Sequence, residues 1–274
     1  MRHAGRWITL TILLIIVAFV LFPFYLVVIN SLKSYQEIVA NVVALPTGFN
    51  FENFTEAFNR MNYPIAFFNT LVVTVAGTSG IVFLASLAGY QIARNNSRVA
   101  KVIFFLLIIP MMIPFQSFMI SLVSVSATFG IYESKWGLSI IYWACGVPMA
   151  VFLYRGFIKG IPKELDEAAM IDGCNAFQTF IRVIFPILKP VTATVIVINA
   201  MWLWNDFLLP RLIIGFNTND FTLQLQAVQF RGMYKMEWQL IMAGFLLTLI
   251  PALVIFFVFQ KQIVKGMVTG AVKG

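Results

Sequence analysis

Six long stretches without a charged residue run through this sequence, and they restrict its fold more than any other feature. A helix that crosses a bilayer needs about 20 mainly apolar residues. The composition agrees, since 60% of the residues are hydrophobic and 11% are charged, against about 45–50% and about 25% in soluble domains. A soluble globular domain is therefore excluded. The stretches are Trp7–Leu32, Met61–Ala93, Val102–Tyr132, Trp136–Tyr154, Pro190–Asn205 and Leu240–Gln260.

We predict an all-α membrane protein with six transmembrane helices, in a single domain that covers residues 1–274. The fifth stretch is long enough to span only when Val183–Leu188 is added, with Lys189 near a helix end. The first stretch follows Arg2 and Arg6, but it is too long for the core of a signal peptide and no small-residue cleavage site follows it, so we expect it to be retained. The expected helices are about 8–29, 69–91, 102–124, 137–155, 186–207 and 239–260.

The positions of the basic residues predict the orientation of these helices. Thirteen of the 19 Lys and Arg residues lie on the side of the N-terminus, and basic loops stay in the cytoplasm. We therefore expect a multi-pass protein of the cell (inner) membrane with both termini cytoplasmic. The charges flank the apolar stretches and do not gather on one soluble face, so the net charge of +8 predicts no nucleic-acid partner.

The cytoplasmic loop 156–185 contains two short predicted helices. Pro162 suits the first position of a helix, three acids follow in its first turns, and Gly173 suits a left-handed C-terminal cap. Asn175 and Gln178 have the spacing of a capping box that begins the second helix. Its apolar stripe is expected at Phe177, Phe180, Ile181 and Ile184.

This loop has the properties of a docking element. The small side chains of Ala168 and Ala169 permit close approach of another surface, and the acids offer partners to its Arg or Lys residues. On the other side of the membrane, segment 31–68 contains Asn53 followed by Glu56, which suggests a short surface helix with Asn53 as its N-cap. A solvated connector is the alternative for this segment.

The sequence Glu167-Ala168-Ala169, then Gly173 and Val183-Ile184-Phe185-Pro186, resembles the EAA loop of ABC-importer permeases. Val183 and Phe185 depart from the Ile and Leu of the family pattern. The resemblance implies an ABC transporter transmembrane domain whose loop inserts into a cleft of a separate ATP-binding subunit. The implied ATPase-coupling residues are Glu164, Asp166, Glu167, Ala168, Ala169, Asp172 and Gly173.

The tail Gln260–Gly274 and the segment Trp204-Asn205-Asp206-Phe207 are similar to the maltose-type carbohydrate permeases, on the second subunit of the pair. The resemblance covers essentially the whole chain. It implies a second homologous permease, an ATP-binding subunit dimer and an extracytoplasmic sugar-binding protein that meets the loop 210–238. It also implies a C-terminal contact with the ATPase, here at Gly270 and Lys273.

The chain lacks the residues that catalysis would need. No Gly-x-x-x-x-Gly-Lys-Ser/Thr phosphate loop is present, and the one histidine is His3. We expect no cofactor in this chain, with ATP and Mg used by the partner ATPase. Cys145 and Cys174 have neither disulfide nor metal-site spacing.

A polar solute also needs aromatic faces and hydrogen-bonding groups along its path. Candidates come from the end of the fifth helix and from the third helix, which Pro110 and Pro114 break. Two alternatives stay open: an ABC importer permease for another solute, and a secondary transporter. The candidate path residues are Gln116, Ser117, Asn199, Trp202, Trp204, Asn205 and Asp206.

Overall fold

The computed structural model describes residues 2–230 and 236–271, and within them every regular element is a helix. The chain divides into two compact units, which are described separately. Unit 1 comprises Met1–Ala66 and Leu223–Pro251, and unit 2 comprises Phe67–Thr222 and Ala252–Gly274. The all-α class expected from the sequence is confirmed, with about 80% of the chain helical.

Unit 1 contains one long apolar helix and several short ones. The long helix, α1, has most of its side chains exposed in this single chain. Helix α14 begins in unit 1 and continues past Pro251. The elements are α1 (Arg2–Ser31), α2 (Tyr35–Ala40), α3 (Glu52–Arg60), α13 (Leu223–Ala227) and the first part of α14 (Trp238–Ala271).

The segment after α1 is ordered by side chains that bind the backbone. Ser34 and Glu37 form a capping box at the start of α2, a helix that we did not predict although its Ser-x-x-Glu signature is in the sequence. The predicted surface helix exists as α3, but Asn53 is not its N-cap. Asn53 lies inside α3, where its buried amide donates to the carbonyls of Ser31 at 2.8 Å and Lys33 at 2.9 Å.

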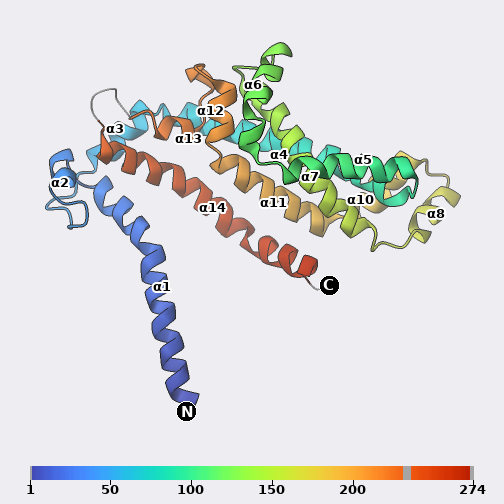
Figure 1. Cartoon of the computed structure of the whole chain (residues 1–274), viewed down its shortest axis with the longest axis horizontal. Coiled ribbons are helices and arrows are strands. Elements are labelled where there is room, and N and C mark those ends of the chain that lie inside the picture. The colour runs from blue at the N-terminus through green and yellow to red at the C-terminus, as the bar shows by residue number, and fades with distance from the viewer. Residues whose placement is uncertain (1, 231–235, 272–274) are drawn as a thin grey trace. The chain divides into compact units, whose positions relative to one another are not determined.

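Unit 2 is built around three helices that pack along one another (Figure 1): α4 (Tyr63–Arg94), which belongs to this unit from Phe67 onward, α7 (Lys135–Ile158) and α11 (Lys189–Asn205). Its other α-helices are α5 (Arg98–Ile108), α6 (Met119–Thr128), α8 (Glu164–Ile171), α9 (Ala176–Thr179), α10 (Phe185–Ile187) and α12 (Leu208–Ile214). Shorter turns are η1 (Ile109–Met112), η2 (Phe115–Ser117), the π-helical η3 (Phe180–Ile184) and η4 (Thr218–Asp220).

Glycines on α4 bring its backbone close to its neighbours. A Cβ at Gly80 would overlap the indole of Trp143, and one at Gly89 would lie 2.7 Å from the Cβ of Tyr154. The Trp143 indole also donates to the carbonyl of Ala76 at 2.9 Å. Small residues at such contacts let membrane helices gain van der Waals energy where no hydrophobic effect joins them. Helices α4 and α7 are therefore in direct contact along much of their length.

Within the part of the chain that the structure describes, four helices are long and apolar enough to cross a membrane: Thr9–Ser31, Tyr63–Arg94, Lys135–Ile158 and Trp238–Phe257. A fifth candidate is the pair Ala176–Ile187 and Lys189–Asn205, which is bent by 78°. The helix expected at about 186–207 therefore does not continue straight through Val183–Leu188. Its apolar run turns at Leu188, immediately before Lys189 and Pro190 begin α11.

The helix expected at about 102–124 is interrupted, as its two prolines suggested. The α-helical part ends at Ile108, and Pro110 lies in η1. The backbone is extended at Ile113 before Pro114, because a proline ring disfavours the helical conformation of the preceding residue. This region therefore consists of α5, η1, η2 and α6, each shorter than a membrane span.

Candidate functional site

Helix α8 ends in a complete glycine cap. Gly173 has φ +86°, its N–H bonds the carbonyl of Met170, and the N–H of Cys174 bonds the carbonyl of Ala169. These two bonds define a Schellman motif, which satisfies carbonyls that the helix leaves open. The predicted cap at Gly173 is confirmed. Pro162 is not the first helical residue, because Lys163 is the N-cap and the helix begins at Glu164.

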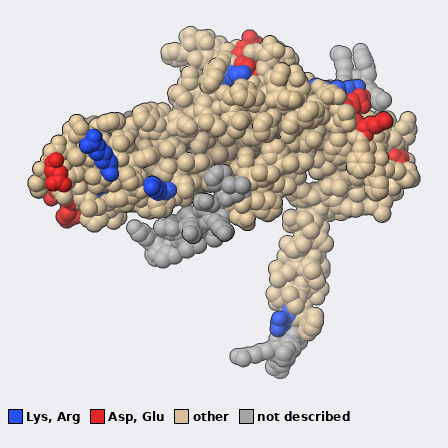
Figure 2. All heavy atoms as spheres, turned by 180° about the vertical axis from the view of Figure 1, so that it is seen from behind, with Lys and Arg blue, Asp and Glu red and all other residues tan. Residues whose placement is uncertain are grey.

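The outward face of α8 combines carboxylates with exposed apolar side chains. Ile171 is 86% exposed and Met170 is 51% exposed. Figure 2 shows acidic side chains gathered at the end of unit 2 that carries α8, at the left of that view. Of the residues predicted for this site, the exposed ones are Glu164, Glu167, Ala168, Asp172 and Gly173. This face offers an apolar centre with negative charges around it.

Two of the predicted coupling residues lie on the inward face of α8 instead. Ala169 is 5% exposed and Asp166 is 7% exposed. The Tyr90 hydroxyl donates to Oδ1 of Asp166 at 2.5 Å, and Nη2 of Arg94 forms an ion pair with Oδ2 at 2.7 Å. We call Tyr90, Arg94 and Asp166 the inner latch. The sequence does not reveal it, because its partners are far apart in the chain.

Arg94 also closes the end of α7. Its Nη1 donates to the carbonyl of Ile161 at 2.9 Å and lies 3.5 Å from that of Ile158, and its Nη2 lies 3.4 Å from that of Pro162. A helix C-terminus carries partial negative charge and unpaired carbonyls, which favour a cation. One guanidinium thus connects α4, the end of α7 and α8.

The second helix of the loop begins as predicted and continues differently. Asn175 and Gln178 form the expected capping box, with bonds of 2.9 and 3.0 Å. Phe180 and Ile184 of the predicted stripe are buried, whereas Phe177 and Ile181 are exposed. The π-helical turn η3 changes the residue spacing, so a stripe derived from the α-helical period is correct only in part.

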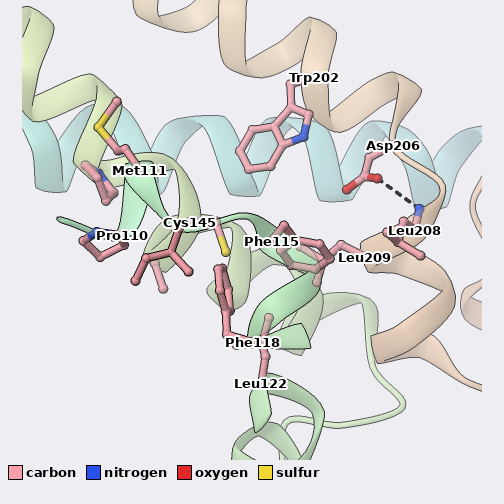
Figure 3. Close-up of a pocket in the computed structure, with 13 residues that line it drawn as sticks. Pro110, Met111, Phe115, Phe118, Leu122, Cys145, Trp202, Asp206, Leu208 and Leu209 are labelled. Carbon is pink, nitrogen blue, oxygen red and sulfur yellow. Dashed lines mark hydrogen bonds between the residues drawn. The ribbon is translucent and has the colours of Figure 1, made fainter. Parts of the chain in front are cut away.

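A pocket of about 480 Å³ lies between η1, η2, α6, α7 and the end of α11 (Figure 3). Its walls are mainly apolar and aromatic, and Asp206 supplies the carboxylate. The Tyr142 hydroxyl donates to Oδ2 of Asp206 at 2.8 Å, and the Leu208 N–H donates to Oδ1 at 3.0 Å. The lining residues are Pro110, Met111, Ile113, Phe115, Phe118, Leu122, Ala144, Cys145, Pro148, Trp202, Asp206, Leu208 and Leu209.

The predicted path residues do not form one group. Trp202 and Asp206 line the pocket. Asn199 and Trp204 are buried in the helix packing, where the Asn199 amide donates to the carbonyl of Val195 at 2.8 Å. The other three, Gln116, Ser117 and Asn205, are exposed outside the pocket lining.

Tyr142 was missed by the sequence reading. It lies inside an apolar stretch, and nothing local in the sequence distinguishes it from a packing aromatic.

A second polar cluster lies at the other end of α4. Nζ of Lys135 donates to Oδ1 of Asn69 at 2.8 Å and lies 3.2 Å from Oδ1 of Asp220. Asn69 in turn donates to the carbonyls of Asn219 and Phe221, at 2.8 and 3.1 Å. We call Asn69, Lys135 and Asp220 the outer latch. It fixes the base of the loop after α12 against α4 and α7.

The C-terminal contact with the ATPase, at Gly270 and Lys273, stays a prediction. Gly270 falls within the bounds of α14, and Lys273 lies outside the described residues. Among the residues that the structure describes, no group of three or more His, Cys, Asp or Glu side chains is placed to hold a metal ion.

Known proteins are similar to this chain along most of its length. A family model described as "Binding-protein-dependent transport system inner membrane component" matches residues 80–269. The "Probable starch degradation products transport system permease protein AmyC" of Thermoanaerobacterium thermosulfurigenes is 38% identical, over 92% of this chain and 91% of its own. The "Melibiose/raffinose/stachyose import permease protein MelC" of Bacillus subtilis is 34% identical, over 97% and 96%.

A solved structure has the same fold. The crystal structure of a bacterial ABC transporter involved in the import of the acidic polysaccharide alginate includes a chain that matches with a TM-score of 0.79. That chain is 18% identical, and the match covers 94% of this chain and 96% of the other. At this identity the likeness concerns the fold alone.

Proposed function

Since this chain belongs to the family of binding-protein-dependent transport system inner membrane components, we propose that it is a permease subunit of an ATP-driven sugar importer. It pairs with a second homologous permease and couples the path between them to a dimer of ATP-binding subunits. An extracytoplasmic sugar-binding protein delivers the substrate. The relatives named for the transport of starch degradation products and of melibiose, raffinose and stachyose support a sugar or oligosaccharide as substrate.

The outward face of α8 is the observation that carries this proposal. The Schellman cap at Gly173 fixes where α8 ends, and Ala168 and Ile171 are exposed on it. Exposed apolar side chains with acids around them are typical of a surface that another protein covers. A cleft with an apolar floor and basic rim on the ATP-binding subunit is the complementary surface, and hydrolysis takes place in that subunit.

The proposed topology has six spans and two cytoplasmic termini. The four long helices provide four spans, the bent pair with α11 provides the fifth, and the region α5–α6 provides the third in chain order. The basic side of the chain faces the cytoplasm. Under this topology α8 is cytoplasmic and the loop after α12 is extracytoplasmic.

Single cysteines test this topology in intact cells. Thr218 and Asn96 are both exposed in unit 2, and neither side chain caps a helix, so Thr218→Cys and Asn96→Cys suit an impermeant thiol reagent. The background carries Cys145→Ala and Cys174→Ala. We expect labelling at position 218 in intact cells, and at position 96 only after permeabilisation. Labelling of position 96 from outside contradicts the proposed orientation.

The pocket beside Asp206 is the proposed contribution of this chain to the sugar path. Trp202, Phe115 and Phe118 offer aromatic faces for a sugar ring, and Asp206 has oxygen lone pairs beyond the two used by Tyr142 and Leu208. Asp206→Asn keeps the volume and removes the charge. We expect the KM for transported sugar to rise, with assembly unchanged.

Reconstitution of the complete complex tests the function itself. Purified complexes in proteoliposomes, with the cognate binding protein, are expected to hydrolyse ATP faster when the transported sugar is present. Ala168→Asp places volume and charge on the outward face, and Gly173→Val strains the cap by about 1–3 kcal/mol. Both variants are expected to insert but to lose the ATP-binding subunit or its sugar stimulation. Unchanged transport by both variants would contradict the coupling role of α8.

A further inference from the structure

We infer that Tyr90 and Arg94 are positioning residues that set the direction of the coupling helix α8 through the buried carboxylate of Asp166. This inference rests on the proposed function, since it concerns how α8 is held while the outward face docks. It gives Asp166 a role different from that of the other acids of α8. They face outward, whereas Asp166 is used inside the chain.

Burial separates this acid from its neighbours on the same helix. The Asp166 side chain is 9% exposed and its Arg94 partner is 14% exposed, whereas Glu164 and Glu167 are both exposed. A buried carboxylate without partners is strongly unfavourable. Asp166 must therefore keep both the Tyr90 hydroxyl and the Arg94 guanidinium, and α8 can take only orientations that preserve them.

The latch holds both arms of the loop. Asp166 belongs to the first arm, and the Tyr90 ring lies 5.2 Å from the ring of Phe180 in the second arm. Arg94 adds the connection to the segment between α7 and α8, through the carbonyls of Ile161 and Pro162. Two residues spaced one helical turn apart on α4 thus contact the end of α7, helix α8 and Phe180 of the second arm.

An apolar contact at this place would hold α8 equally well without fixing its direction. Replacing a buried ion pair by apolar residues of similar volume is often neutral or stabilising, so stability alone does not explain a carboxylate here. Hydrogen bonds are directional, and a bond of 2.5 Å from a side chain on a long helix fixes rotation as well as distance. The latch therefore converts a rotation of α4 about its axis into a change of direction of α8.

The test compares transport with hydrolysis in the reconstituted complex. Asp166→Asn removes the charge, Tyr90→Phe removes one oxygen atom, and Arg94→Lys keeps the charge but loses the forked contacts. We expect Asp166→Asn to lower the sugar transported per ATP hydrolysed by about fivefold or more, the lower range of allosteric couplings. Tyr90→Phe should lower it less, and Arg94→Lys should retain more coupling than Arg94→Ala. The ATP-binding subunit should copurify with each variant.

Three outcomes are distinguishable. If Asp166→Asn and Tyr90→Phe both transport as much sugar per ATP as the unmodified complex while Ala168→Asp does not, the latch is refuted and the docking face stands. If Ala168→Asp and Gly173→Val are also without effect, the coupling role proposed for α8 fails. If Asp166→Asn does not assemble, Tyr90→Phe decides, because it removes only a hydroxyl. Glu52→Gln, an exposed acid of α3, is the control for expression and insertion.

Discussion

The inner and outer latches use the same chemistry at the two ends of α4 but hold different kinds of structure. Each joins a basic side chain, an aspartate and a polar residue of α4. Positions 69 and 94 are about 37 Å apart along the helix axis at a rise of 1.5 Å per residue. The inner latch holds a helix through a residue in its first turns, and the outer latch holds a loop at its base.

Their exposure differs accordingly. The inner pair of Asp166 and Arg94 is 9% and 14% exposed, and the outer pair of Asp220 and Lys135 is 16% and 21% exposed. Beyond the outer latch, Phe216 is 81% exposed. We conclude that the inner latch fixes an orientation, whereas the outer latch supports a loop whose tip is available to a partner.

Removing the inner cation should have the largest effect on stability. Arg94→Ala leaves the Asp166 carboxylate buried with only the Tyr90 hydroxyl, and uncompensated buried charges cost about 3–5 kcal/mol. Thermal unfolding of the purified chain in detergent measures this loss, and Arg94→Ala combined with Asp166→Leu should recover most of it. A loss below that of Lys135→Ala would reverse the order of the two latches.

For the glycines near the two latches, the order of stability costs should be the opposite, with the larger cost at the outer end. Gly215 has φ +61° and ψ −113°, and an added Cβ would lie 2.8 Å from the Tyr132 hydroxyl. Gly173 also has positive φ, but an added Cβ would meet nothing within 4 Å. Gly215→Ala should therefore cost about 2–3 kcal/mol and Gly173→Ala about 1 kcal/mol. Equal shifts in unfolding temperature would contradict this ranking.

Removing the outer cation should be milder and should affect a different activity. Lys135→Ala leaves Asp220 with the Lys135 backbone N–H at 3.0 Å and access to water, so we expect a cost of about 1–2 kcal/mol. The loop after α12 should lose its position, and stimulation of ATP hydrolysis by the binding protein should fall while basal hydrolysis persists. Lys135→Arg is the matched control. If stimulation by the binding protein is unchanged in Lys135→Ala, the loop after α12 is not the contact site of the binding protein.

The Glu37 carboxylate, which is half-buried in unit 1, should make the smallest contribution to stability. The Thr47 side chain, then the Ser34 and Thr47 backbone N–H groups, lower the pKa of Glu37 from 4.5 to about 2. A lowered folded-state pKa means that the contribution to stability is complete above pH 4.5 and disappears as the pH falls toward 2. Proteolysis of segment 34–47 should increase over that range. Glu37→Gln should remove the pH dependence of this proteolysis. If the variant keeps the pH profile of the unmodified protein, Glu37 is not the group responsible.

Local features of the fold could be predicted from the sequence, and features that join distant residues could not. Gly173 and the pair Asn175 and Gln178 behave as expected because a cap depends on a few consecutive residues. The prediction of Asn53 as an N-cap was wrong because its hydrogen-bond partners are distant in the sequence. Its local pattern is that of a cap, but its amide binds carbonyls of Ser31 and Lys33, about twenty positions earlier.

The candidate site shows the same division. All the acids of α8 have similar local surroundings, and only the structure distinguishes Asp166, whose partner Arg94 lies on another helix. The 78° bend at Leu188 was also missed, because apolar residues on both sides read as one continuous span. Lys189-Pro190 was the available signal, since proline favours the first turn of a new helix.

The glycine contacts between α4 and α7 determine which parts of unit 2 can bend. A surface in which Gly80 and Gly89 fit against Trp143 and Tyr154 resists sliding, because any shift drives backbone into side chain. The packed pair of α4 and α7 is therefore the rigid part of unit 2. The hinges of unit 2 lie at the bend at Leu188 and at the extended residue Ile113. A mechanism that opens the sugar path to one side of the membrane and then to the other must concentrate its motion at these two hinges. Substitutions there should alter the rate of this conformational change more than the affinity for the sugar.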